Sequence, residues 1–283
     1  MTSSLFPLHI CLGFAAGWLL VSAVTYVIEK YGAGPAGLVG ALPSTAALNL
    51  FFIGATQTKD AAIQSTSVFP LSFSITFGFL LFFAYPQRTA FVPRLAIALT
   101  LWFLLELLLA ISHFDDFNLA LPVSIIASSA VYLAYRGRGI RNARPIEGNP
   151  EIKRVAAKGV LGGVVVGAVV FFSAIAGPLV GGVVGAAPAL WGSSLIANRA
   201  EDIEVSRSLA KSFSQVGMLT IIPYYVAVRY VLYGVNTGLG PAVDVGLAIL
   251  WGYVAISPLI LLAWRTTKKT QREAGVGNTS TRV

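Results

Sequence analysis

The sequence predicts an all-α polytopic membrane protein with nine transmembrane helices, arranged as two inverted four-helix repeats that a central helix joins. Three features lead to this prediction: the apolar composition, the distribution of basic residues and a repeated glycine–proline pattern. Of the 283 residues, 56% are hydrophobic and 11% are charged, whereas about a quarter of the residues in an ordinary soluble domain are charged. The charged residues form short clusters between apolar runs of about twenty residues, the length that crosses a bilayer core.

Nine apolar runs are long enough to be predicted as membrane spans. The sixth and seventh are separated only by Gly177 and Pro178, but a single helix over 155–197 would be about twice as long as the bilayer is thick. We therefore expect two separate spans there. The predicted spans cover residues 5–28, 34–55, 65–85, 91–112, 117–135, 155–176, 178–197, 207–232 and 240–264.

The basic residues predict the orientation of the chain. With nine spans and an external N-terminus, all of the 20 Lys and Arg residues except Lys59 and Arg229 lie on the inner side. Cytoplasmic loops carry such an excess of basic residues, and eight or ten spans would scatter them over both faces. The N-terminus is therefore predicted outside and the C-terminus inside, in a multi-pass protein of the plasma membrane. The net charge acts as an orientation signal and calls for no nucleic-acid partner.

A glycine–proline pattern occurs twice, as GPAGLVGALPST in 34–45 and as GPLVGGVVGAAP in 177–188, and both contain Gly-Ala-x-Pro. A shift of about 146 residues also places Gly13 and Gly17 on Gly159 and Gly163. The shared offset predicts two four-helix repeats, and the single helix between them requires the second repeat to be inverted. The predicted divisions are 1–112 for the first repeat, 113–154 for the central helix with a basic cytoplasmic loop, 155–264 for the second repeat and 265–283 for a cytoplasmic tail expected to be disordered.

Glycine and proline inside the second and seventh spans predict breaks in two helices. A proline removes a backbone hydrogen bond, and lipid offers no water to replace it. Inverted repeats with broken helices that line a polar path are typical of secondary transporters. The alternative is close packing, because small residues four positions apart let helices approach each other. The predicted substrate path consists of Gly40, Pro43, Ser44, Thr45, Asn49, Gly185, Pro188, Ser193, Ser194 and Asn198.

Two carboxylates inside predicted spans are candidates for coupling transport to a proton or cation. Glu106 interrupts the leucine-rich stretch LWFLLELLLA, where an ionised carboxylate is costly. Asp244 lies one turn into the ninth span, where it equally suits the positive end of the helix dipole. The topology places both in the outer half of the membrane. With Asp60, Asp115 and Asp116 in the outer loops, the outer face is expected to be acidic and to attract cations.

Enzyme classes find little support in the sequence, and no catalytic residue, metal ligand or cofactor is expected. His9 and His113 are far apart, and HExxH, GxSxG, Walker and dinucleotide glycine patterns are absent. The single Cys11 excludes a disulfide within the chain and a cysteine-rich metal site. The span count and size also resemble those of the intramembrane prenyltransferases, which imply two aspartate-rich loops, but here Asp60 stands alone and Asn198-x3-Asp202 is only part of one such motif.

The favoured hypothesis is a secondary transporter that moves a small solute or ion by alternating access, with proton or cation coupling as one form of it. A passive channel is the second hypothesis, because glycine-kinked inverted repeats also form pores. A membrane assembly subunit without transport activity is the third. The expected partners are the lipid bilayer and a small solute or ion, and all three hypotheses are compatible with an oligomer.

Overall fold

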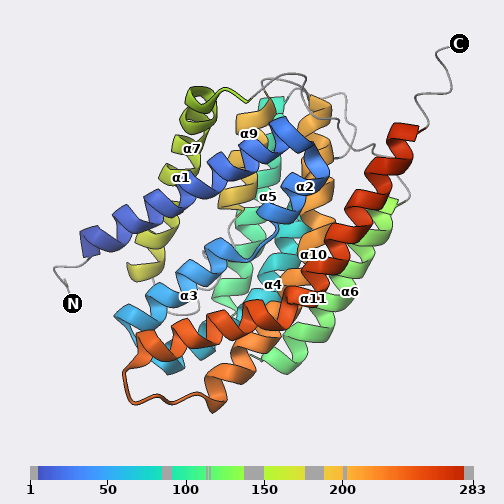
Figure 1. The fold of residues 1–283 in the computed structure, drawn as a ribbon. Helices are drawn as coiled ribbons and strands as arrows, with labels where there is room; N and C mark the ends of the chain where they lie inside the picture. The colour runs from blue at the N-terminus through green and yellow to red at the C-terminus, as the bar shows by residue number, and fades with distance from the viewer. Residues whose placement is uncertain are drawn as a thin grey trace, which may run out of the picture.

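The computed structural model of the chain describes residues 6–84, 91–112, 114, 116–136, 150–175, 188–199 and 203–276, and every regular element in these ranges is a helix. The long helices run side by side from one end of the molecule to the other (Figure 1). The helices are α1 (Phe6–Tyr31), α2 (Ala33–Gly40), α3 (Ser44–Thr56), α4 (Lys59–Ala84), α5 (Phe91–Ile111), α6 (Phe117–Arg136), α7 (Ile152–Ile175), α9 (Ala189–Arg199), α10 (Ile203–Gly234) and α11 (Pro241–Val276).

Six helices of the described part are long and apolar enough to cross a membrane, namely α1, α4, α5, α6, α10 and α11. Their large apolar side chains are often exposed, as in α5, where Leu108 and Ile111 are each 64% exposed. Apolar surface on this scale suits a lipid environment. The prediction of an all-helical, multi-pass membrane protein is confirmed at this level. The count of nine spans, the inverted repeats and the choice of the plasma membrane stay predictions.

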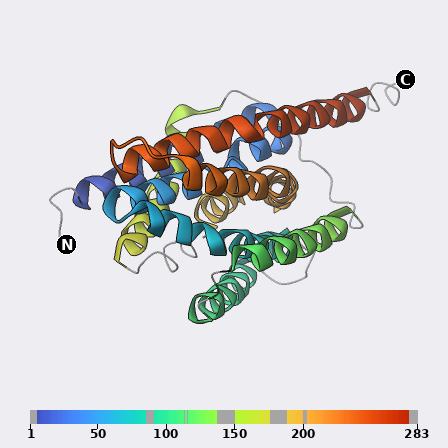
Figure 2. The same ribbon diagram turned by 90° about the horizontal axis from the view of Figure 1, so that it is seen from below.

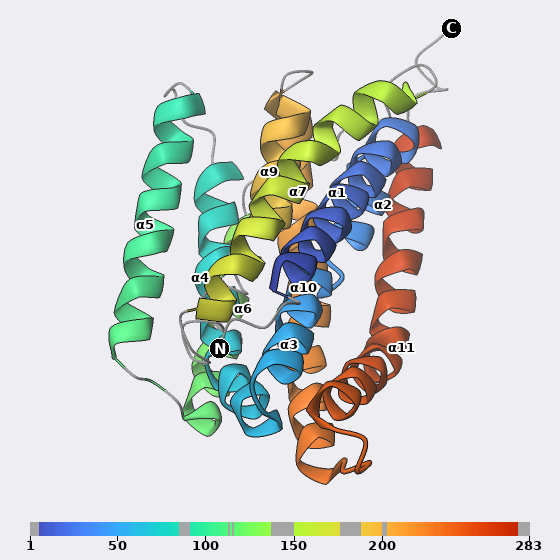
Figure 3. The same ribbon diagram turned by 90° about the vertical axis from the view of Figure 1, so that its left-hand side faces the viewer.

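The helix α5 lies at the edge of the bundle, where Figures 2 and 3 show it beside α4 and away from α1 and α11. Its buried residues are Phe91, Arg94, Ala98 and Glu106, and the rest of its surface is largely exposed. By contrast, most of the α4 span is buried. The arrangement therefore places α4 in the centre of the bundle and α5 at its edge, with apolar side chains exposed.

Glycines form the contact between α1 and α7, which cross in opposite directions (Figure 3). A Cβ atom on Gly17 would lie 2.6 Å from the carbonyl oxygen of Gly162, and one on Gly163 would lie 2.8 Å from the ring of Phe14. Only glycine permits backbones to approach this closely. Close packing, the alternative explanation left open by the sequence, therefore accounts for the glycines of this seam.

The predicted break in the first glycine–proline motif is present. The helix α2 ends at Gly40 and α3 begins at Ser44, with Pro43 at φ −74° and ψ 45° between them. The two helices continue in the same general direction, so together they form one interrupted helix (Figure 1). In the second motif Pro188 directly precedes α9. The preceding residues 177–187, including Gly185, lie outside the described residues.

Candidate solute path and outer pocket

The break between α2 and α3 leaves backbone carbonyls without helical partners, and side chains from distant helices bind them. The Trp191 Nε1–H of α9 donates to the Gly40 carbonyl at 2.7 Å. The Thr220 hydroxyl of α10 lies 3.2 Å from the Ala41 carbonyl and 3.0 Å from the Val216 carbonyl of its own helix, and its single proton is shared between these two acceptors. Both side chains are buried. Buried carbonyls need partners because lipid supplies none. The break is therefore held by single side-chain hydrogen bonds, which can open without unfolding a helix.

The contact with Trp191 brings one predicted path residue, Gly40, close to the α9 segment that carries two others. Ser193 and Ser194 follow Trp191 on α9, and both are buried. Asn49 is buried on α3, whereas Ser44 lines an apolar groove of about 450 Å³ between α1, α3 and α11. The structure thus connects Gly40 with the start of α9 but places Ser44 toward a lateral groove. The side chains of Thr45 and Asn198 are outside the described part.

Aromatic rings fill the space around Trp191. Its ring centroid lies 6.0 Å from Phe73, 5.7 Å from Phe77 and 5.9 Å from Phe213. Phe73 also contacts Tyr225 at 5.7 Å, so rings extend continuously from the break along α4 and α10. The sequence predicts hydroxyl groups along the path but not these rings. The four-residue spacing of the phenylalanines on α4 places them on one helix face and is the signal that could have found them.

Glu106 points away from lipid and toward α4. The residue is 2% exposed, and both carboxylate oxygens lie 2.7 Å from the Ser72 hydroxyl. In the described part of the chain no lysine or arginine forms an ion pair with it. A carboxyl group in such a site is able to exchange a proton or to link two helices. The geometry therefore keeps Glu106 as a candidate for coupling.

Asp244 has a local partner. Its Oδ1 accepts hydrogen bonds from the backbone N–H of Thr237 at 3.0 Å and from the Thr237 hydroxyl at 2.7 Å. These bonds fasten the connection between α10 and α11 to the first turn of α11. This is the arrangement expected of a helix-start residue, the second interpretation of Asp244. Its role in coupling stays a prediction.

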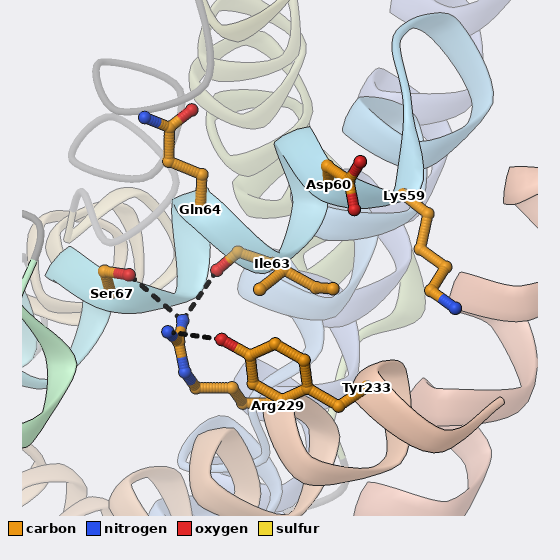
Figure 4. A pocket seen from close by; sticks show the side chains of 7 residues that line it. All are labelled: Lys59, Asp60, Ile63, Gln64, Ser67, Arg229 and Tyr233. Carbon is orange, nitrogen blue, oxygen red and sulfur yellow. Dashed lines mark hydrogen bonds between the residues drawn. The ribbon is translucent and has the colours of Figure 1, made fainter.

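A polar pocket of about 370 Å³ lies where α4 begins and α10 ends (Figure 4). Arg229 NH1 lies 2.8 Å from the Ile63 carbonyl and 2.8 Å from the Thr66 hydroxyl, and NH2 lies 2.9 Å from the Tyr233 hydroxyl. The guanidinium carbon is 4.6 Å from the centre of the Phe117 ring, a cation–π distance. Charged and polar side chains from two helices line the pocket, among them Lys59, Asp60, Gln64, Ser67, Arg229 and Tyr233.

This pocket differs from the acidic outer face expected from the sequence. Lys59 and Arg229, the two basic residues assigned to the outer side, both line it, together with the single carboxylate of Asp60. The pocket therefore carries a net positive charge.

The described residues also contain no group of three or more His, Cys, Asp or Glu side chains that could hold a metal ion. Comparisons with protein-family models, curated proteins and solved structures found no match.

Proposed function

We propose that the chain is a secondary transporter that moves a small solute across the membrane by alternating access. The observation that carries the proposal is the break between α2 and α3, where side chains of α9 and α10 lie within hydrogen-bond distance of the Gly40 and Ala41 carbonyls. In transporters, interrupted helices expose backbone polar groups to a path shielded from lipid. Alternating access requires two arrangements of similar free energy. Side-chain hydrogen bonds between the two halves of the chain are suited to such an exchange.

Nine crossings and two inverted repeats belong to the same proposal. In this proposal α1, α2 with α3, α4 and α5 form the first set, α7, α9, α10 and α11 belong to the second, and α6 stands alone between them. Gly17 packs on Gly162 at the crossing of α1 and α7, and the sequence offset pairs Gly17 with the adjacent Gly163. Gly17 thus meets the immediate neighbour of the residue to which the offset relates it, a register close to that of offset-related pairs. A two-fold axis in the membrane plane would produce this register.

The orientation can be tested by thiol labelling. Ser112 directly follows α5 and Glu151 directly precedes α7, and both side chains are exposed. The end of α5 and the start of α7 lie at opposite ends of the bundle (Figure 3). In a chain with Cys11→Ser, we expect Ser112→Cys to react in intact cells with a membrane-impermeant maleimide. We expect Glu151→Cys to react only after permeabilisation, because the inner side carries the basic clusters. Reaction of Glu151→Cys alone in intact cells would reverse the proposed topology.

Transport itself is tested in proteoliposomes with a panel of small solutes, with and without proton and sodium gradients. The proposal predicts saturable uptake with counterflow for one solute class. Trp191→Phe keeps a ring but removes the donor to the Gly40 carbonyl. We expect this variant to slow uptake about tenfold. Loss of a buried hydrogen bond costs about 1–3 kcal/mol, and it would destabilise the conformation of the transport cycle in which Trp191 binds Gly40.

Trp18→Phe is the matched control, because the Trp18 indole donates to the Ala156 carbonyl at 2.9 Å in the seam between α1 and α7, away from the break. It should affect stability to a similar extent while leaving the uptake rate per folded molecule close to that of the wild type. Equal rate losses in both variants would remove the break from the mechanism. Flux without saturation or counterflow would favour the channel hypothesis instead.

A further inference from the structure

Among the described residues, the Arg229 cation of the polar pocket has no charged partner. Arg229 is half-buried, and its described hydrogen bonds go to neutral oxygens of Ile63, Thr66, Ser67 and Tyr233. Among the described residues, no carboxylate lies within ion-pair distance of it. Removing a cation from water without an anion is costly. The neutral oxygens hold the guanidinium in place without neutralising its charge.

The remaining donors of Arg229 suit a planar oxyanion. The described bonds use NH1 and one side of NH2, which leaves the Nε–H and one NH2 hydrogen without a described acceptor. An arginine binds a carboxylate with two parallel N–H groups. Lys59 adds a second positive charge while its Nζ donates to the Val235 carbonyl. Asp60 in the lining and Asp244, which interacts electrostatically with Lys59, supply opposing negative charge, so the pocket fits a monoanion better than a polyanion.

The pocket also lies at one end of the line of aromatic rings. Tyr225 precedes Arg229 by one turn on α10 and stacks on Phe69 at 4.2 Å. The Tyr225 hydroxyl is buried and has no hydrogen-bond partner among the described residues. From Tyr225 the rings continue through Phe73 to Trp191, which binds the break. The Tyr225 hydroxyl, without a described partner, thus lies between the pocket and the proposed path.

We propose that this pocket binds a small monoanionic oxyanion, in its simplest form a carboxylate, with Arg229 as the principal binding residue. The pocket would then be the outer entrance of the solute path, and in that respect the inference rests on the proposed function. Its volume of about 370 Å³ falls within the usual range of small-molecule sites. Asp60 would limit affinity and exclude anions of higher charge by repulsion.

Binding is measured without transport, so its failure would leave the transport proposal intact. The full-length protein in phosphatidylcholine nanodiscs is titrated with sodium acetate, and the midpoint of thermal unfolding is followed at constant ionic strength with sodium chloride. A ligand that binds the folded state raises this midpoint with concentration. We expect acetate to do so with a dissociation constant on the order of 1 mM. Methylammonium chloride, the cationic probe, should have no effect.

The variants separate binding from folding. Arg229→Gln should weaken acetate binding at least about tenfold, and Arg229→Lys should bind with intermediate affinity, because it keeps the charge but loses the planar fork. Asp60→Asn should bind acetate about threefold to tenfold more tightly, because a repelling charge is removed. Such a gain cannot result from misfolding. Lys153, an exposed cation in the first turn of α7 and outside the pocket lining, provides the control: Lys153→Gln should bind as the wild type does.

The source of the oxyanion is resolved by repeating the acetate titration in nanodiscs with phosphatidylglycerol. An unchanged acetate response assigns the pocket to a soluble anion, and a response lost only with the anionic lipid assigns it to a lipid phosphate. The absence of an acetate effect in both lipids, or a midpoint raised by methylammonium, would overturn the inference. The inference would also be overturned if the affinity for acetate were unchanged both in the Asp60→Asn variant and in the Arg229→Lys variant. Acetate would then bind outside this pocket.

Discussion

Gly17→Ala should lower the free energy of unfolding by about 2–3 kcal/mol, the range for overpacked sites in well-packed interiors. The added Cβ would lie 2.6 Å from the Gly162 carbonyl oxygen and 2.6 Å from the Val166 Cβ. Backbone cannot move aside without separating α1 from α7 along the whole seam. The higher helix propensity of alanine offsets at most about 1 kcal/mol of this loss. Thermal unfolding in detergent measures the effect, with a decrease in the midpoint of about 5 °C or more.

Gly167→Ala is the matched control within the same seam. A Cβ there would find its nearest atoms at 3.6 Å, an ordinary contact distance. We expect this variant to be as stable as the wild type or slightly more stable, because alanine favours the helix. If both substitutions lowered the midpoint equally, close backbone approach would not explain the glycines of α1 and α7.

Glu106→Gln should fold and insert normally but lose uptake driven by a proton gradient while retaining exchange. Glutamine preserves the size of the side chain and a hydrogen bond with the Ser72 hydroxyl, which lies 2.7 Å from each carboxylate oxygen. It removes the group that gains and loses a proton. Gradient-driven uptake should decrease by at least about a hundredfold, the lower range for loss of a positioned proton-transfer group. Flux and thermal stability are measured on the same preparation.

Ser72→Ala separates coupling from structure at this site. It leaves Glu106 in place but removes its only described hydrogen-bond partner, so stability should decrease by about 1–3 kcal/mol. Coupled uptake per folded molecule should remain. If Glu106→Gln were instead the destabilised variant and kept its coupling, Glu106 would be a structural link between α4 and α5 and not part of the mechanism.

Composition and apolar length were sufficient to predict the membrane class, because a bilayer imposes both on any chain that crosses it. The break near Pro43 was equally predictable, since proline and glycine weaken a helix wherever they occur. The glycines of α1 were noticed through their offset from those of α7. Their meaning as a packing seam needed the structure, because glycine spacing does not identify the helix that packs against it.

The partners of the break could not be predicted, because they come from distant parts of the chain. Trp191 lies 151 residues from Gly40, and no local pattern links the two. The same holds for Glu29, whose ion pairs with Arg154 and Lys158 at 3.2 Å join α1 to α7. Asp244 shows the opposite case: its partner Thr237 is only seven residues away, within reach of local helix-capping arguments.

The net positive charge of the pocket that contains Lys59 and Arg229 could not be predicted by counting charges in the sequence. Counting placed five carboxylates on the outer side, but among the described residues only Asp60 lines the pocket, whereas Glu106 binds Ser72 and Asp244 binds Thr237. The pocket instead collects Lys59 and Arg229, which come from the start of α4 and the end of α10. The local charge of a site depends on which side chains the fold brings together, which a count over whole loops does not contain.

The central claim, that the region around the break opens in turn to both sides of the membrane, is tested most directly by the accessibility of Ser194. This side chain is buried on α9, one turn from Trp191. In a Cys11→Ser chain reconstituted in liposomes, the thiol introduced by Ser194→Cys is offered a water-soluble methanethiosulfonate from either side, with Thr100→Cys on exposed α5 as the lipid-facing control. Alternating access predicts modification of Ser194→Cys from both sides and none of Thr100→Cys. Complete protection of Ser194→Cys from both sides would contradict the account and return the break to a packing role.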